Sequence, residues 1–387
     1  MATKKATDKK ATAAAAKKAA PAKKACGKKA CKKTAPAAEA APATSGNVLK
    51  VVPGKKIPVG AVKIYHDADA SLSPLEGKTV AVLGYGSQGR AQACCLRDSG
   101  VNVIIGVRPG NSFKAAKADG FEVMSVDKAA KKADIIHLLL PDEQHKQIFE
   151  AQIKQYATPG KTLCCSHGFA YVYKTIVPPE GVDVIMVAPK GPGREVRRVY
   201  EQGFGCPGLV AVFQDASGTA LQTALALAKG IGLTRGGVLE CTMEQETYED
   251  LFGEQNVLCG GLVDLMKYGF EVLTEAGYPP EMAYFECIHE AKLIVDIIYE
   301  KGIAGMNDSI SNTAEFGEYY NGPKIITPDV KKRMKESLER IQSGKFAKEW
   351  LREAAKGAPK LTKKREELSK HTVEIVGAEI RKLFEHK

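Results

Sequence analysis

Residues 77–112 constrain the fold of this chain more than any other segment. They read GKTVAVLGYGSQGRAQACCLRDSGVNVIIGVRPGNS, in which an apolar run at 80–83 leads into the pattern Gly84-x-Gly86-x-x-Gly89. A helical pattern then extends to Ser99, and a second apolar run covers 101–107. A strand, a glycine turn, a helix and a second strand within about thirty residues form the unit that binds a dinucleotide, with the pyrophosphate at the helix N-terminus. The segment therefore predicts a Rossmann-type domain.

The end of the second strand predicts which dinucleotide binds. Enzymes that use NAD usually carry an acidic residue about 20 positions after the glycines, where it holds the ribose 2′-hydroxyl. This chain has Arg108-Pro-Gly-Asn-Ser112 there instead. Because a guanidinium and a hydroxyl suit a 2′-phosphate, the sequence favours NADPH.

Alternating strand and helix signals continue through residue 190. Apolar strands end at Pro141-Asp142, at His167 and at Lys190. Ligands of open α/β sheets bind beyond the carboxyl ends of the strands, so the Asp142, His167 and Lys190 side chains should face the cofactor. His137 lies within a strand and is interpreted as a core histidine with satisfied hydrogen bonds.

After residue 241 the strand signals stop, and two long apolar helices each carry two carboxylates four residues apart. Asp250 and Glu254 form the first pair, and Glu286 and Glu290 form the second. Residues four apart lie on one helical face. A single pair of this kind is usually solvated or ion-paired, but four buried carboxylates would repel each other unless cations neutralise them. Oxygen-only ligands suit Mg²⁺ rather than zinc, so the sequence predicts a magnesium site.

The basic character of the chain is confined to its first residues. Of the net charge of +11, residues 1–45 contribute +10, from twelve lysines against Asp8 and Glu39. This Lys/Ala-rich tail has too few apolar residues to form a core and is predicted to be disordered. We expect its lysines either to bind polyanions weakly and without sequence preference, or to serve only as a solubilising extension.

Composition also bounds the location and the domain organisation. No segment approaches the roughly 18 consecutive apolar residues of a membrane span, so we expect no membrane association. The ten cysteines form no C-x-x-C pair, and a reducing cytoplasm is the expected compartment. The predicted fold class is α/β, with the tail at 1–46, a Rossmann NADP-binding domain at 47–242 and an all-helical metal- and substrate-binding domain at 243–387.

Seven motifs together resemble ketol-acid reductoisomerases of the shorter-chain class, class I. They are GYGSQG, DIIHLLLPDE, SHGF, APKGPG, DLFGEQ, MAYFECIHE and SISNTAEFGEY, and the resemblance covers residues 61–385. It implies a Rossmann domain followed by a knotted helical domain, in a homo-oligomer (dimer or dodecamer) whose active sites are shared between chains. It also implies conversion of 2-acetolactate or 2-aceto-2-hydroxybutyrate to the 2,3-dihydroxy acid with NADPH and two Mg²⁺, in branched-chain amino-acid biosynthesis.

The resemblance also assigns roles to residues of this chain. His167 matches an active-site histidine, Lys190 matches a lysine beside the metal-bound water, and Ser311 matches a serine that holds the substrate carboxylate. Asp250 and Glu254 of one chain, with Glu286 and Glu290 of the partner subunit, match the ligands of two Mg²⁺ ions, and Glu290 also matches a proton carrier. The implied cofactor contacts are Gly84, Tyr85, Gly86, Ser87, Gln88, Gly89, Arg108, Ser112, Asp142, Glu143, Gln144, His145 and Gly193.

The chain departs from the family pattern at two places. The loop after Arg108 is slightly shorter than in many relatives and has Asn111 where Ser is common, which weakens the prediction of NADPH preference. Arg194 follows KGPG where relatives often carry His.

Two other interpretations follow from the residues. An NADP-dependent hydroxyacid dehydrogenase would also combine a Rossmann and a helical domain, but it relies on a catalytic lysine and needs no carboxylate quartet. A nucleoid-associated protein would use the basic tail as its functional part.

Overall fold

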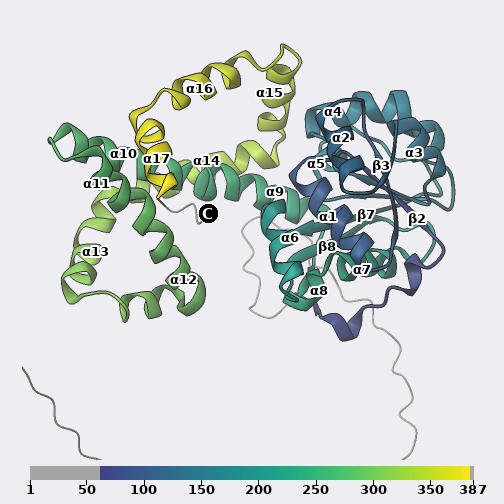
Figure 1. The fold of residues 1–387 in the computed structure, drawn as a ribbon, viewed down its shortest axis with the longest axis horizontal. Helices are drawn as coiled ribbons and strands as arrows, with labels where there is room; N and C mark the ends of the chain where they lie inside the picture. The colour runs from purple at the N-terminus through teal and green to yellow at the C-terminus, as the bar shows by residue number, and fades with distance from the viewer. Residues whose placement is uncertain (1–61, 384–387) are drawn as a thin grey trace, which may run out of the picture. The chain divides into compact units, whose positions relative to one another are not determined.

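The computed structural model describes residues 62–383, so the predicted disorder of the 1–46 tail lies outside the described residues. The centre is a nine-stranded sheet in the order β1-β9-β8-β7-β6-β5-β2-β3-β4 (Figure 1). Neighbours from β4 to β7 are parallel, whereas β8 is antiparallel to β7 and β1 is antiparallel to β9. The six parallel strands have the order of a dinucleotide-binding sheet. The strands are β1 Ile64–Tyr65, β2 Thr79–Leu83, β3 Asn102–Gly106, β4 Glu122–Met124, β5 Ile135–Leu138, β6 Thr162–Cys165, β7 Asp183–Pro189, β8 Gly208–Gln214 and β9 Val238–Glu240.

Helices cover both faces of the sheet, because successive strand side chains point to opposite sides (Figure 1). Val80 and Val82 of β2 pack into one core with residues of α1, α6 and α7, while Ala81 and Leu83 pack into a second core with residues of α3 and α5. Burial on both faces explains why the strands read as continuous apolar runs. These helices are α1 Ser87–Asp98, α2 Asn111–Ala118, α3 Val126–Lys132, α4 Asp142–Ile148, α5 Phe169–Val172, α6 Gly193–Glu201, α7 Ala220–Ile231 and α8 Leu233–Gly236.

The chain after β9 is helical and has two small cores of its own. Leu251 and Ile341 pack against Phe169 of α5, whereas Phe270 and Tyr284 belong to a separate cluster. Apart from these clusters, α10, α12 and α13 leave many apolar side chains exposed. The helices are α9 Met243–Gly253, α10 Gly261–Glu275, α11 Pro280–Tyr284, α12 Glu290–Asn307, α13 Asn312–Ile325, α14 Pro328–Gln342, α15 Lys345–Ala354, α16 Pro359–Ser369 and α17 Thr372–Lys382.

Helix α9 begins with a capping box that fixes its start. Thr242 Oγ1 accepts from the Gln245 backbone N–H at 3.1 Å, and Gln245 Oε1 accepts from the Thr242 N–H at 2.8 Å. From this start, Glu246, Asp250 and Glu254 follow at successive turns. A π-helical turn, Glu254–Leu258, continues α9, and another, Phe285–His289, joins α11 to α12. One member of each predicted carboxylate pair, Glu254 and Glu286, therefore lies in a π-helical turn, a feature that occurs frequently at functional sites.

The architecture confirms the predicted fold class, a Rossmann-type α/β domain followed by helices. Residues 62–383 belong to one compact unit, so the domain boundary at 242/243 stays a prediction, as does the knot. Within residues 62–383, no helix is both long enough and apolar enough to cross a membrane.

Candidate active site

A cavity of about 1420 Å³ opens at the carboxyl ends of the parallel strands. Its walls include Gly84 after β2, Arg108 after β3, Leu139 after β5, Ser166 after β6 and Lys190 after β7. Strands β2 and β5 are neighbours from which the chain proceeds in opposite directions across the sheet. Open α/β sheets bind ligands at such a switch point.

Close packing excludes a side chain at Gly84 of the glycine-rich loop and at Gly193, where α6 begins against that loop. Gly84 has φ +103°, and a Cβ there would lie 2.3 Å from the Leu139 carbonyl oxygen. A Cβ on Gly193 would lie 2.2 Å from the Ser87 carbonyl oxygen. Because α1 begins at Ser87, the free amides of its first turn are available to a pyrophosphate. Of the contacts predicted here, Gly84, Tyr85, Gly86 and Gln88 line the cavity, and Ser87, Gly89 and Gly193 do not.

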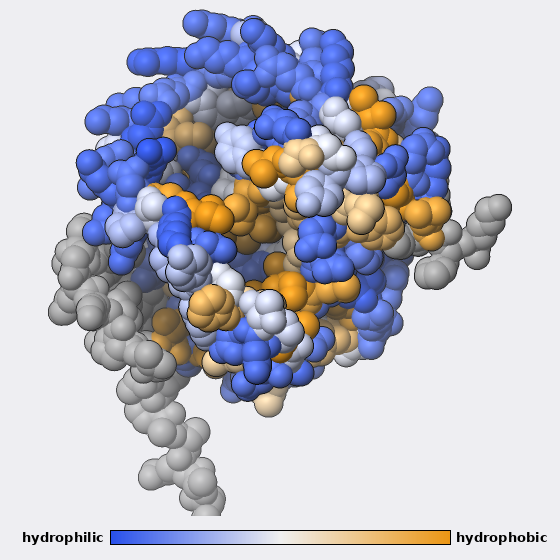
Figure 2. Space-filling model, turned by 90° about the vertical axis from the view of Figure 1, so that its left-hand side faces the viewer, coloured by the Kyte–Doolittle hydropathy of each residue, from blue (hydrophilic) through white to orange (hydrophobic). Residues whose placement is uncertain are grey.

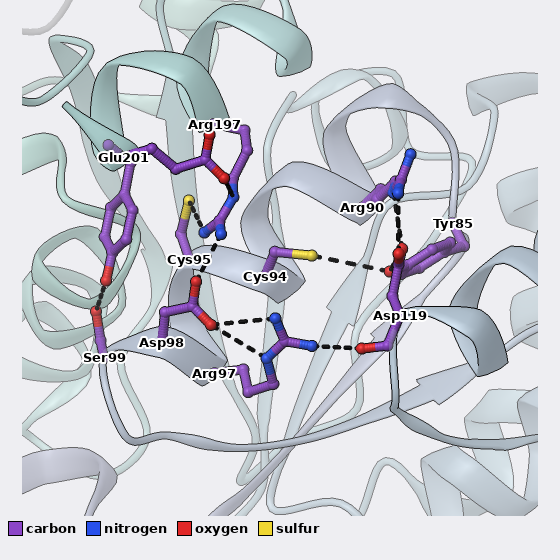
Figure 3. Close-up of polar contacts among 11 residues, drawn as sticks. Tyr85, Arg90, Cys94, Cys95, Arg97, Asp98, Ser99, Asp119, Arg197 and Glu201 are labelled. Carbon is purple, nitrogen blue, oxygen red and sulfur yellow. Dashed lines mark hydrogen bonds and ion pairs between the residues drawn. The ribbon is translucent and has the colours of Figure 1, made fainter.

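The Tyr85 hydroxyl belongs to a polar network that joins α1 to α2 (Figure 3). It donates to Asp119 Oδ2 at 2.7 Å, and Arg90 pairs with the same oxygen at 2.7 Å. Asp119 follows the last turn of α2, and Ser112 lies in the first turn. The network therefore fixes α2 against α1 and holds the loop of Arg108 and Ser112, both of which line the cavity.

The segment 142–145 forms the first turn of α4, and only part of it faces the cavity. His145 is buried, and its Nε2–H donates to the Leu140 carbonyl oxygen at 2.8 Å. Burial lowers the pKa of His145, which keeps the ring neutral. Asp142, Gln144 and His145 line the cavity, and Glu143 does not.

Two cationic and two anionic side chains form a cluster where α9 meets the ends of β6 and β7. Lys190 Nζ lies 3.2 Å from Glu246 Oε1 and 3.0 Å from Asp250 Oδ1. His167 Nδ1 lies 3.1 Å from Glu246 Oε2 and 3.4 Å from Asp250 Oδ2. The structure thus brings three of the predicted site residues, His167, Lys190 and Asp250, close together and adds Glu246.

The carboxylates set the protonation of both cations in the cluster. Burial lowers the pKa of His167, but the hydrogen bond that His167 donates to Glu246 and the charges of Glu246, Asp142 and Asp250 outweigh it and raise the pKa to about 9. Burial also opposes the charge of Lys190, and the same pair, Glu246 and Asp250, raises its pKa above the usual value. His167 lines the cavity, and its Nε2 is buried with no hydrogen-bond partner among the described residues.

Glu254 faces the cavity without a cation of its own. It forms no ion pair within residues 62–383, and burial together with the charge of Asp250 raises the pKa of its carboxyl. Next to it, ligand atoms of His167, Glu246 and Asp250 all lie within 4.8 Å of one another. Carboxylate oxygens one helical turn apart, with charge left uncompensated, fit a hard divalent cation such as Mg²⁺.

The second predicted carboxylate pair lies away from the cavity. Glu286 and Glu290 are exposed, and in the described part of the chain neither lines the cavity nor pairs with a cation. Ser311 is also exposed, and its Oγ caps α13 by accepting from the Ala314 N–H at 3.1 Å. One chain therefore assembles only half of the predicted carboxylate quartet.

Glu246 is the residue that the sequence analysis missed. Its side chain is 2% exposed, the least of the cluster. A signal was present, because Glu246, Asp250 and Glu254 place carboxylates on three successive turns of one helical face. Considering carboxylates as pairs concealed this series of three.

Comparison with known proteins gives matches over most of the chain. The family described as acetohydroxy acid isomeroreductase, NADPH-binding domain, matches residues 74–237, and the C-terminal domain family of ketol-acid reductoisomerase matches 243–386. A ketol-acid reductoisomerase (NADP(+)) of Akkermansia muciniphila is 76% identical over 83% of this chain and 99% of its own length. One of Methanocaldococcus jannaschii, also named for NADP(+), is 54% identical over 83% of this chain and 98% of its own.

A solved structure is similar over the same region. It is an NADH-preferring ketol-acid reductoisomerase from an uncultured archaeon, with a TM-score of 0.82 and 59% identity, covering 84% of this chain and 100% of its own. The relatives therefore differ in the nicotinamide cofactor that their names record.

Proposed function

This chain belongs to the ketol-acid reductoisomerase family, and from that premise we propose that it converts 2-acetolactate and 2-aceto-2-hydroxybutyrate to 2,3-dihydroxy acids in branched-chain amino-acid biosynthesis. The observation that carries the proposal is the placement of His167, Lys190, Asp250 and Glu254 beside the glycine-rich loop in one cavity. Such a site can hold a nicotinamide cofactor and an anionic substrate side by side.

In this proposal Asp250 and Glu254 hold Mg²⁺, and Glu286 and Glu290 of the partner subunit complete a two-ion site. Bound Mg²⁺ supplies Lewis acidity that polarises the substrate ketone and stabilises negative charge on its oxygens. The raised pKa of Glu254, with no ion pair among the described residues, supports the assignment, because that carboxylate gains most from a nearby cation.

The remaining residues of the cluster handle protons and charge. When the alkyl group moves from C2 to C3 of the substrate, the C2 hydroxyl loses a proton and the C3 oxygen gains one. His167 lines the cavity and stays protonated because its pKa is raised, and Glu290 of the partner subunit is the proposed carrier. Lys190 holds Glu246 and Asp250 in place and contributes positive charge against the anionic substrate.

We propose NADPH as the hydride donor that reduces the rearranged ketone. Arg108 and Ser112 line the cavity after β3, and no acidic side chain at this loop is available to hold a ribose 2′-hydroxyl.

Replacing Ser112 with Asp is expected to lower kcat/KM for NADPH by about 10²-fold and to change that for NADH little, because a carboxylate repels the 2′-phosphate. Ser112→Ala is the matched control: it removes the hydroxyl without adding charge and should cost NADPH only a few-fold. Steady-state kinetics with both cofactors measure the ratio. An unchanged ratio in Ser112→Asp would show that the 2′-phosphate binds elsewhere.

The exposed apolar face of the C-terminal helices supports a shared active site. Val272 of α10, Tyr299 of α12 and Phe316 of α13 are 64%, 82% and 71% exposed. Figure 2 looks onto this side, where apolar residues gather among hydrophilic ones. Monomeric proteins rarely expose large contiguous apolar patches. We propose that a second copy of the chain covers this face and brings Glu286 and Glu290 of the partner subunit to the cavity.

The composition of the tail suggests a binding role for it. The twelve lysines of residues 1–45 are proposed to bind polyanions with Kd on the order of 10⁻⁴ to 10⁻⁶ M. The test compares how strongly DNA retains the full-length protein and a chain starting at Asn47 across a salt series. Equal retention of the two at low salt would refute the proposal.

The eight cysteines within residues 62–383 are free thiols, which supports a reducing cytoplasm.

The test of the proposed function is NADPH oxidation with 2-acetolactate, with and without Mg²⁺. We expect turnover that chelation abolishes and that added Mg²⁺ restores. Activity that survives thorough chelation, or reduction of a simple 2-keto acid with no activity on 2-acetolactate, would favour a hydroxyacid dehydrogenase instead.

A further inference from the structure

A buried series of side chains links three loops of the cavity. Gln92 of α1 is 0% exposed, and its Nε2 lies 3.0 Å from Gln88 Oε1 and 3.0 Å from Ser166 Oγ. Gln88 Nε2 donates in turn to the Gly191 carbonyl oxygen at 2.8 Å. On the other side, His137 Nε2 lies 2.8 Å from Gln92 Oε1.

The directions of the hydrogen bonds that run from Gly191 through Gln88 and Gln92 to His137 follow from one group, and the Ser166 hydroxyl can also donate to Gln92 Oε1, at 3.4 Å. The Gly191 carbonyl can only accept, so Gln88 must present its amide nitrogen there and its Oε1 to Gln92. Gln92 must then turn its nitrogen toward Gln88 and its Oε1 toward His137. His137 must therefore carry its proton on Nε2, and burial, which lowers the pKa of His137 to about 4, keeps it neutral with that single proton.

Each end of the series lies next to a part of the candidate site. Gln88 is in the glycine-rich loop, Ser166 precedes His167, and Gly191 follows Lys190. His137 lies within β5, which pairs with β2 on one side and β6 on the other. The Gln92 amide nitrogen thus bonds to Gln88, in the glycine-rich segment, and to Ser166, which precedes His167 of the charged cluster. Its amide oxygen bonds to His137 in the sheet.

We propose that Gln92 is a positioning residue that sets the glycine-rich loop, the Ser166–His167 turn and the Lys190–Gly191 turn at a fixed separation. Cofactor binding and the placement of His167 and Lys190 are coupled through its amide. The inference rests on the proposed roles of these two residues. A buried glutamine that only satisfied the core would not need to bond two loops and a strand at once.

The first test replaces Gln92 with Met, which keeps the length of the side chain and removes all of its hydrogen bonds. We expect kcat to fall by about 10²-fold, because misplacement of about 1 Å at a catalytic group costs that much. We also expect the dissociation constant for NADPH to rise by about fivefold and the NMR signals of the His167 ring to shift. The last two readouts need no turnover, so inactivity of the unmodified enzyme would overturn the proposed function without touching this inference.

The double variant Gln92→Met with His137→Leu separates positioning from stability. The single change leaves the buried His137 Nε2–H without a partner, which lowers the melting temperature. Replacing both partners with apolar groups should restore most of the melting temperature. Because the bonds to Gln88 and Ser166 stay broken, kcat is expected to remain low. Recovery of kcat together with the melting temperature would overturn the proposal.

Two further variants keep the test decisive if the Gln92 variants fold poorly. Ser166→Ala breaks one link at the wall of the cavity and should lower kcat by about tenfold with NADPH affinity unchanged. Gln214→Met is the matched control, since Gln214 also donates to two carbonyl oxygens, those of Pro179 and Val182. These bonds lie near the amino end of β7, whereas the cavity opens at its carboxyl end. Gln214→Met should lower the melting temperature and leave kcat unchanged. Normal kcat in Ser166→Ala, or equal loss of kcat in Gln214→Met, would contradict the positioning role.

Discussion

Replacing Asp250 with Asn is expected to lower turnover of 2-acetolactate by about 10³-fold at ordinary Mg²⁺ concentrations. Asp250 contacts both Lys190 and His167 and is a proposed metal ligand, so loss of its charge affects each of these groups. The amide keeps the size of the side chain and one oxygen, and therefore isolates the effect of the charge. Turnover as a function of Mg²⁺ and direct Mg²⁺ binding by calorimetry measure the effect.

The control for this variant is Glu244→Gln, which removes an exposed carboxylate from the first turn of the same helix. A surface change of this kind is expected to alter turnover by no more than about twofold. Asp250→Asn with ordinary turnover and unchanged Mg²⁺ affinity would remove the metal site from this end of α9.

Replacing Glu246 with Gln is expected to lower kcat by about 10²-fold, although Glu246 is not a proposed metal ligand. Its carboxylate is almost completely buried and accepts from both His167 and Lys190. Without its charge, Lys190 and protonated His167 share Asp250 alone, and a Gln amide would direct a donor at one of them. Thr247→Ser, the next residue on the buried face of α9, is a control for disturbance of helix packing.

The same variant should change how stability depends on pH in the metal-free protein. The pKa of His167 is raised from 6.5 to about 9 in the folded state, so its charge stabilises the fold fully below about pH 6.5, and this contribution is lost as the pH rises through 9. In Glu246→Gln only the charges of Asp142 and Asp250 still raise the pKa of His167, and burial continues to lower it. Melting temperatures between pH 6 and 9.5 in chelator should therefore fall less steeply for the variant, and identical slopes would contradict the charge assignment.

Local sequence signals were enough to predict the Rossmann half of the fold. The glycine fingerprint and the apolar runs placed β2, α1 and β3 close to their observed bounds, because these features depend on neighbouring residues. The far edge of the sheet could not be predicted in this way. There β8 runs antiparallel to β7, and Tyr65 donates to Glu240 across 175 positions at 2.6 Å. Such pairings depend on distant contacts that no periodicity records.

The residues of the candidate site differ in the same way, because some have a local signal in the sequence and others do not. His167 and Lys190 were predicted from their place at strand ends, and Asp250 from its spacing to Glu254. Glu246 was missed because its burial comes from the packing of α9 against the sheet, which the helix pattern does not reveal. The exposure of Glu286 and Glu290 also has no local signal. The sequence of an apolar helix does not show whether its own chain or a second copy of the chain covers it.

Complementation between two inactive variants tests most directly the proposal that two chains build each active site. Asp250→Asn disables the first carboxylate pair and Glu290→Gln the second, so each protein alone should be inactive. Co-expressed chains that pair at random should recover about one quarter of the wild-type activity, because half of the dimers are mixed and each mixed dimer has one intact site. No recovery in a mixture shown by mass spectrometry to contain mixed oligomers would contradict the shared site and place all four carboxylates within one chain.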